Sequence, residues 1–243
     1  MIGADGAWSR VRLLLTPVVP IYTSITLIEL VISDLETRFP HFASLIGNGL
    51  AFIISDNKAI IPQRNSYGTV RIYVGLRVPE NWIDEHPLPS DPIQARQFLA
   101  SLLEGWSPSV LDIVHSVDDA PMTTRKLVAL PPSFTWTTTL RGITLIGDAA
   151  HVMSPFAGEG VNQALLDAYS LGKELVNSLN SGLAGEERAV KVDEGLRRHE
   201  QAMQKRTQSK AEESASNLEA IFSKGAPHTF VEVVKSFGPP RED

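Results

Sequence analysis

One stretch of the chain combines residue types that could bind a ligand through backbone and carboxylate groups. It reads Gly147-Asp-Ala-Ala-His-Val-Met-Ser-Pro-Phe-Ala-Gly-Glu-Gly-Val-Asn-Gln-Ala-Leu-Leu-Asp167. The apolar run before it, Ile143–Ile146, predicts a strand that ends at Asp148, and a helix is predicted to begin at Gly160. A carboxylate at a strand end can accept hydrogen bonds from ligand hydroxyls, and a helix start offers free N–H groups. Open α/β folds bind cofactors at such places.

A plain strand–loop–helix connection explains the same residue types equally well, with Asp148 only capping a turn. Gly158 and Gly160 could also suggest the Gly-x-Gly-x-x-Gly fingerprint that binds dinucleotides. However, Gln163 stands where the third glycine belongs, and a long loop separates the glycines from the predicted strand. The stretch is therefore not that fingerprint.

A second, weaker motif opens the chain and reads Gly3-Ala-Asp-Gly-Ala-Trp-Ser-Arg-Val-Arg12. Asp5 and the glycine after it predict a turn, and Ser9 could cap a helix. Arg10 or Arg12 could meet a phosphate. No strand is expected before this motif, and an Asp-Gly pair alone is usually only a turn.

The two motifs together, in this order, resemble the FAD-dependent aromatic hydroxylases, the single-component flavoprotein monooxygenases. Residues Gly3–Arg12 look like the family's Asp-Gly fingerprint, and Gly147–Asn162 look like its Gly-Asp fingerprint. The segment from Pro62 to Trp82 is similar to the tetracycline-inactivating branch and its fungal relatives. The resemblance covers nearly the whole chain.

The resemblance implies FAD as cofactor, NAD(P)H as co-substrate, and hydroxylation of an aromatic or polyketide-like small molecule with O2. Asp148 would bind a ribityl hydroxyl, while Asp5 and Arg10 would lie near the FAD pyrophosphate and the approach of NAD(P)H. The helix from Gly160 would aim its dipole at flavin N1 and O2. The other cofactor-binding residues that the resemblance implies are Pro155, Ala157, Gly158, Gly160, Val161 and Asn162. It names no catalytic base.

The sequence departs from this family at its beginning. Family members start with a strand, a Gly-x-Gly-x-x-Gly motif and, about 20 residues later, an acidic ribose ligand. None of these is present here. The expectation is an N-terminally truncated member that holds FAD weakly. The alternatives are a non-catalytic remnant or binding protein derived from the family, and a partner that completes a split flavoprotein.

The residues between the two motifs predict an antiparallel sheet. Ile21–Ser33 is apolar on both faces, which is typical of a buried strand. Three further runs, separated by turn signals, are Leu50–Ser55, Lys58–Gln63 and Thr69–Arg77. The last run alternates apolar and polar residues, so one face of the sheet is expected to contact water. Gln63 and Arg71 could contact a polar substrate there, although contact with water is the simpler explanation.

Helical periods follow the sheet. Asp91-Pro92 predicts the start of an amphipathic helix that continues to Trp106. Ser107–Val117 predicts a second short helix, and Met122–Leu130 predicts a strand that returns to the sheet.

The helix from Gly160 is expected to end at Asn180-Ser-Gly182. Its apolar residues share one face and are Val161, Ala164, Leu165, Ala168, Leu171, Leu175 and Leu179. A long polar helix is predicted from Glu186 to about Phe222, and a last helix after Pro227.

The predicted fold class is α+β: an antiparallel substrate-domain sheet with helices, packed on the C-terminal remainder of a Rossmann-like FAD-binding domain. Residues 1–20 and 136–183 are assigned to the FAD-binding part. Residues 21–135 form the predicted substrate domain, and residues 184–243 a C-terminal helical segment. A segment missing from the FAD-binding part would bare apolar surface, so self-association is expected.

Composition excludes several classes of function. The 243 residues carry a formal charge of −6, which argues against nucleic-acid binding. The absence of Cys excludes disulfides and thiolate chemistry, and the six His residues show no metal-ligand spacing. His151 is expected to be a structural hydrogen-bonding residue. No run approaches the about 18 apolar residues of a membrane span, so a cytoplasmic protein without stable membrane insertion is expected.

Overall fold

The computed structural model describes residues 1–137 and 139–236. The chain divides into two compact units. The first, called the helical unit here, comprises Met1–Thr23 and Val128–Glu219. The second, called the sheet unit, comprises Ser24–Leu127 and the residues from Ala220 onward.

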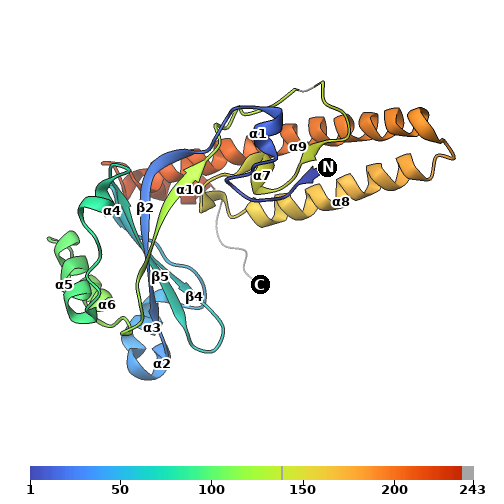
Figure 1. The fold of residues 1–243 in the computed structure, drawn as a ribbon. Coiled ribbons are helices and arrows are strands. Elements are labelled where there is room, and N and C mark those ends of the chain that lie inside the picture. The colour runs from blue at the N-terminus through green and yellow to red at the C-terminus, as the bar shows by residue number, and fades with distance from the viewer. Residues whose placement is uncertain (138, 237–243) are drawn as a thin grey trace. The chain divides into compact units, whose positions relative to one another are not determined.

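The sheet unit is built on five strands in the order β3-β4-β5-β2-β6 (Figure 1). The strands are β2 (Ile21–Ile32), β3 (Ile53–Ser55), β4 (Lys58–Arg64), β5 (Val70–Arg77) and β6 (Thr123–Ala129). In the antiparallel register, Ile28 of β2 faces Val74 of β5, and Gln63 of β4 faces Arg71 of β5. All five strands lie within the runs predicted from the sequence or within one residue of them, so the predicted antiparallel sheet is confirmed.

Helices of the same unit cover one face of this sheet. They are α2 (Leu35–Arg38), α3 (Pro40–Ile46), α4 (Trp82–Glu85), α5 (Pro92–Leu102) and α6 (Pro108–His115). The Asp91 carboxylate caps α5 as predicted, because it accepts the backbone N–H of Gln94 at 2.9 Å. Ile28, Ile72 and Leu99 are fully buried in the resulting core. Trp82, Trp106 and Met122 pack against it.

The other face of the sheet is partly covered as well. Phe222, from the end of α9 (Gly185–Ile221) and the turn before α10 (His228–Ser236), lies against Gly75. A Cβ at Gly75 would come within 2.6 Å of the Phe222 ring, so only glycine fits. Arg77 donates from Nε to the Phe222 carbonyl at 2.7 Å. The expectation that this face contacts water is therefore wrong near Gly75, where Phe222 covers the sheet. A local sequence pattern cannot show this, because Phe222 lies about 145 positions further along the chain.

The helical unit contains a short parallel sheet. Strand β1 (Ile2–Gly3) pairs with β7 (Thr144–Leu145), with Gly3 opposite Leu145. The one-turn helix α1 (Arg12–Leu15) follows β1. The expectation that no strand precedes the Asp-Gly motif is therefore corrected: two residues form one. So short a strand has no periodicity that a sequence pattern could reveal.

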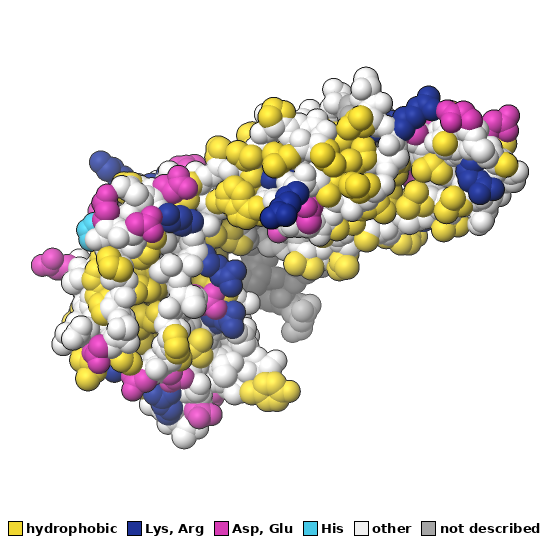
Figure 2. Space-filling view, in the orientation of Figure 1, with side chains coloured by type: hydrophobic (Ala, Val, Ile, Leu, Met, Phe, Trp, Pro, Cys, Tyr) yellow, Lys and Arg dark blue, Asp and Glu magenta, His cyan; other side chains and the backbone are white. Residues whose placement is uncertain are grey.

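Helices α8 (Gly160–Leu179) and α9 form a long hairpin in the helical unit (Figure 1). The buried residues of α8 are mostly polar and comprise Gln163, Asp167, Leu171 and Ser178. The apolar stripe predicted along α8 is largely exposed, with Val161 at 75% and Leu165 at 66%. This agrees with the expectation of bare apolar surface: α8 turns its polar side toward α9, where Asp167 and Ser178 find partners. Figure 2 shows hydrophobic side chains gathered along this part of the surface.

No helix among residues 1–137 and 139–236 is both long and apolar enough to cross a membrane.

Candidate cofactor site

The turn after β7 places Asp148 on the surface of the helical unit. Gly147 has φ +60° and ψ −145°, which glycine alone adopts readily. Its carbonyl accepts the N–H groups of Ala150 at 2.8 Å and His151 at 3.0 Å, which starts the short helix α7 (Asp148–His151). Asp148 follows as the first helical residue and is exposed. Because Gly147 occupies the N-cap position, no side chain caps α7 within the described part of the chain.

The loop from Pro155 to Gly160 brings bare backbone to the start of α8. Pro155–Ala157 form a 3-10 turn, and Gly158 follows with φ +67°. A Cβ at Gly158 or Gly160 would meet nothing within 4 Å, so the backbone there is open to a ligand. No side chain from the described ranges caps α8, and its first turn carries no acidic residue. Its free N–H groups and dipole can therefore meet an electron-rich ligand atom.

Val161 and Asn162 occupy the first turn of α8, and both are exposed. The structure thus brings Pro155, Ala157, Gly158, Gly160, Val161 and Asn162 together in one loop and helix start. Asp148 belongs to the same unit, a few residues earlier in the chain.

The Asp-Gly segment is held by hydrogen bonds of its own. The Asp5 carboxylate accepts the backbone N–H of Arg10 at 2.8 Å and of Val11 at 3.4 Å. The Ser9 hydroxyl, together with these N–H groups, lowers the pKa of Asp5 and outweighs the opposing effect of burial. Asp5 therefore stays ionised and fixes the turn, while Arg10 remains exposed.

Arg12 is a structural residue, which removes it as a candidate phosphate ligand. It is almost completely buried and donates to three backbone carbonyls, those of Val18 at 3.2 Å, Ala149 at 2.9 Å and Ala7. The bond to Ala149 ties the Asp-Gly segment to α7. Arg10 and Arg12 look alike in sequence, and only the fold shows which one is buried.

A buried polar network beneath the turn was missed from the sequence. Asp167 of α8 is fully buried and accepts the Gly147 N–H at 2.9 Å and the ring Nε2 of His151 at 2.6 Å. Its other oxygen pairs with Arg206 of α9, whose Nε donates to Gln163 at 2.7 Å. His151 is confirmed as a structural hydrogen-bonding residue. Asp167 sits at the end of the Gly-Asp motif, but its partner Arg206 lies 39 positions away with no pattern linking them.

A second buried pair lies further along the hairpin. The Ser170 hydroxyl bonds with His199 Nδ1 at 2.8 Å. Burial is the main reason that the pKa of His199 is lowered, with Arg206 and His151 adding to the effect against Asp167 and Glu174. His199 is therefore kept neutral inside the hairpin.

Gln63 and Arg71 lie in the sheet unit. Gln63 is exposed, and Arg71 forms an ion pair with Glu29 at 3.0 Å while remaining partly open to solvent. Glu29 also pairs with Arg125 at 3.3 Å. Among the described residues, no group of three or more His, Asp or Glu side chains could hold a metal ion.

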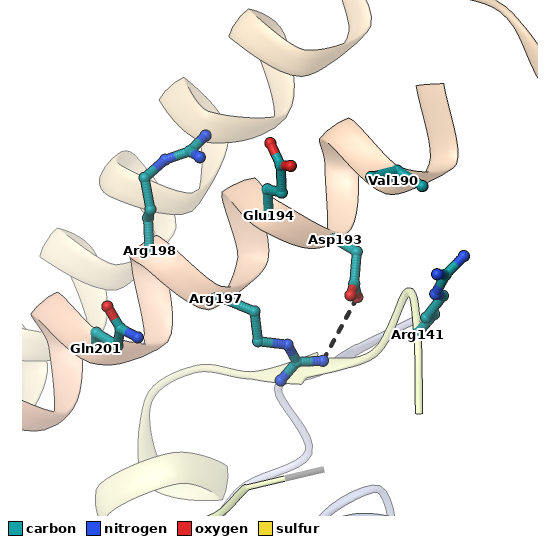
Figure 3. A pocket seen from close by; sticks show the side chains of 7 residues that line it. All are labelled: Arg141, Val190, Asp193, Glu194, Arg197, Arg198 and Gln201. Carbon is teal, nitrogen blue, oxygen red and sulfur yellow. Dashed lines mark hydrogen bonds and ion pairs between the residues drawn. The ribbon is translucent and has the colours of Figure 1, made fainter. Parts of the chain in front are cut away.

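A hollow on α9 carries many charges, shown in Figure 3. Its lining residues are Arg141, Val190, Asp193, Glu194, Arg197, Arg198 and Gln201. Arg197 pairs with Asp193 at 3.5 Å, and Arg198 pairs with Glu174 at 2.8 Å. Arg141 pairs with Glu186. Since these arginines are already neutralised, the hollow is a poor anion site compared with the open loop before α8.

Comparison with known proteins finds similarity in the part of the chain that contains the Asp148 turn and the 155–162 loop. Residues 119–207 match the family model described as FAD binding domain. The chain is 28% identical to the monooxygenase asqM of Emericella nidulans over 97% of its length, and 31% identical to the monooxygenase penA of Penicillium thymicola over 72%. It spans 62% of asqM and 48% of penA. The expected fungal relatives are thus confirmed.

The fold is also that of solved flavoproteins. Klebsiella pneumoniae HpxO, complexed with FAD and uric acid, superimposes with a TM-score of 0.70 at 20% identity. The match covers 97% of this chain and 54% of HpxO. Both fingerprints lie on the chain and the family match spans the Gly-Asp segment, so the chain resembles the FAD-dependent aromatic hydroxylases, a family of flavoprotein monooxygenases.

Proposed function

We propose that this chain provides the flavin-binding loop and the substrate sheet of an FAD-dependent monooxygenase. The reaction would hydroxylate an aromatic or polyketide-like small molecule with NAD(P)H and O2. One observation carries the proposal: an exposed carboxylate, Asp148, precedes a glycine-containing loop that ends at the open start of a 20-residue helix. These are the groups that a polyhydroxylated chain and an electron-rich ring require.

The residues present fit the flavin half of FAD. Asp148 can accept a ribityl hydroxyl, since its side chain is exposed. The backbone of Gly158 and Gly160 lies open, so a flat ring can approach it closely. The N-terminal dipole of α8 would stabilise negative charge on the ring edge.

When bound, FAD would supply the redox and oxygen chemistry, and this chain's residues would position it. Asp148 would orient the ribityl chain, and the 155–162 loop would hold the ring edge. Asp5 and Arg10 are proposed to face the pyrophosphate side and the approach of NAD(P)H. Residues 1–20 and 136–183 would form the FAD-binding part, residues 21–135 the substrate domain, and residues 184–243 the C-terminal helical segment.

A small ring compound is the proposed substrate, because the similar protein HpxO was solved as a complex with FAD and uric acid. Gln63 and Arg71 are the candidate substrate contacts in the sheet unit. Self-association is proposed through the exposed apolar side chains of α8, including Leu165 and Tyr169. Sedimentation velocity at increasing concentration, with Leu165→Glu as the variant that should remain monomeric, tests this.

The cofactor proposal is tested by flavin titration of Asp148→Ala. Losing a charge-assisted hydrogen bond costs about 1.5–3 kcal/mol, so FAD affinity is expected to fall about 10- to 150-fold. Asp112→Ala, on the exposed side of α6, is the control and should bind FAD like the wild type. The titration extends to millimolar flavin so that weak binding can be measured. Unchanged FAD affinity in Asp148→Ala, with a lower melting temperature, would show that this carboxylate serves only the fold.

A further inference from the structure

The buried carboxylate of Asp167 connects three separate elements. Oδ2 accepts the Gly147 N–H at 2.9 Å and contacts His151 Nε2 at 2.6 Å, which fixes both ends of the turn that carries Asp148. Oδ1 pairs with Arg206 of α9. Asp167 is fully buried, so these are its partners in place of water. One side chain of α8 thus holds the β7–α7 turn from below.

The conformation of Gly147 determines where Asp148 points. Gly147 stands in a backbone region that is costly for other residues, and its carbonyl is already used to start α7. Its N–H donates to Asp167, so both backbone polar groups of Gly147 are held by hydrogen bonds. We propose that Asp167 is a positioning residue: it holds the Gly147 peptide so that the Asp148 carboxylate is presented outward for the cofactor.

An amide cannot replace this carboxylate. All three partners of Asp167 approach as hydrogen-bond donors or cations: the Gly147 N–H, His151 and the Arg206 guanidinium. In Asp167→Asn, the side-chain NH2 must face one of these donors in either orientation. These contacts of Asp167 with Gly147, His151 and Arg206 are called the clamp here. The substitution keeps size and shape, so it weakens the clamp, at the Gly147 side or at the Arg206 side, without opening a cavity.

Glu174 offers a matched control on the same helix. It also pairs with an arginine of α9, Arg198, at 2.8 Å, but no bond links it to the Gly147 turn. Glu174→Gln therefore breaks a contact between α8 and α9 while leaving the clamp intact. Any effect that follows from weakening the hairpin should appear in both variants.

The direct test is amide hydrogen exchange in the cofactor-free chain. Asp167→Asn is expected to speed exchange at Gly147 about 10- to 100-fold, with little change in a β4 peptide of the sheet unit. Glu174→Gln should leave exchange at Gly147 at the wild-type rate. A uniform increase in every peptide, or no change at Gly147, would overturn the proposal.

A flavin titration forms the second arm, and only this arm rests on the proposed function. Asp167→Asn should weaken FAD binding at least tenfold at a temperature where the variant is fully folded, and Glu174→Gln should not. If the wild type binds no flavin, the proposed function fails. The exchange experiment still shows whether Asp167 holds Gly147 in place. If Asp167→Asn does not fold, exchange of the wild-type Gly147 amide decides: protection supports the clamp, and rapid exchange contradicts it.

Discussion

The two units close their interiors in different ways. In the sheet unit, helices α2, α3, α5 and α6 bury an apolar core around β2, β4 and β5. In the helical unit, the interior of the α8–α9 hairpin includes Asp167, Arg206 and His199, while apolar side chains of α8 face outward. The first region is held by hydrophobic burial, which tolerates changes in charge. The second combines a smaller apolar cluster around Leu145, Ala149 and Met203 with a few directional polar contacts, which also hold the turn that carries Asp148.

The largest expected effect of this difference concerns apolar truncation. Leu99→Ala removes a fully buried side chain from the sheet core and should lower the free energy of unfolding by about 2–5 kcal/mol. Leu165→Ala truncates an exposed side chain of α8 and should change it by less than about 0.5 kcal/mol. Urea unfolding of both variants provides the measurement. Equal losses would show that the outer face of α8 is packed after all.

Alanine substitutions at two glycines, Gly75 in the sheet unit and Gly160 in the helical unit, test the comparison next. Gly75→Ala would drive a methyl group into the Phe222 ring and should cost about 1–3 kcal/mol of stability. Gly160→Ala meets open space, so stability should hold or rise by up to about 1 kcal/mol through helix propensity. Its methyl group would instead block ligand approach and weaken flavin binding about tenfold. Thermal melts combined with flavin titration separate the two effects. A stable Gly75→Ala would contradict the close packing of Phe222.

The sheet could be predicted from the sequence because its information is local. Alternation along β5 and the Asp91-Pro92 pair determine strands and helix starts within a few residues. The helical unit was harder. Periodicity correctly grouped the apolar residues of α8 on one face, but it cannot say whether a neighbour covers that face. The face of α8 that turns toward α9 is set by the ion pair between Asp167 and Arg206, which joins positions far apart in the sequence. The Asp148 loop could be located by motif, whereas the network beneath it could not.

The smallest effect concerns pH. Burial lowers the pKa of His199 below the about 6.5 of the unfolded chain, so the unfolded state takes up a proton first as pH falls. Stability should therefore decline as the pH drops below about 6.5. His199→Asn should reduce the difference in melting temperature between about pH 8 and about pH 5.5. An unchanged difference would mean that His199 carries none of the acid sensitivity.

Asp118 of the sheet unit provides the contrast. Burial would raise its pKa, but hydrogen bonds from Ser33 and Arg38 outweigh burial and lower it. A lowered carboxyl pKa stabilises the fold above about pH 4, and this contribution is lost only as pH falls further. Melts near pH 5.5 should therefore leave Asp118→Asn and the wild type equally pH-dependent, unlike His199→Asn.

The most direct test of the central claim is to find where flavin binds. Amide exchange of the chain, with and without millimolar FAD, should show protection concentrated in two segments: Gly147–His151 and residues 155–162. Riboflavin should protect the same segments, because the residues proposed to bind FAD would contact the flavin half of the cofactor. Protection at both segments is the predicted result. Flavin-dependent protection that leaves both segments unchanged, or that appears only on the α9 hollow around Arg197, would contradict the assignment.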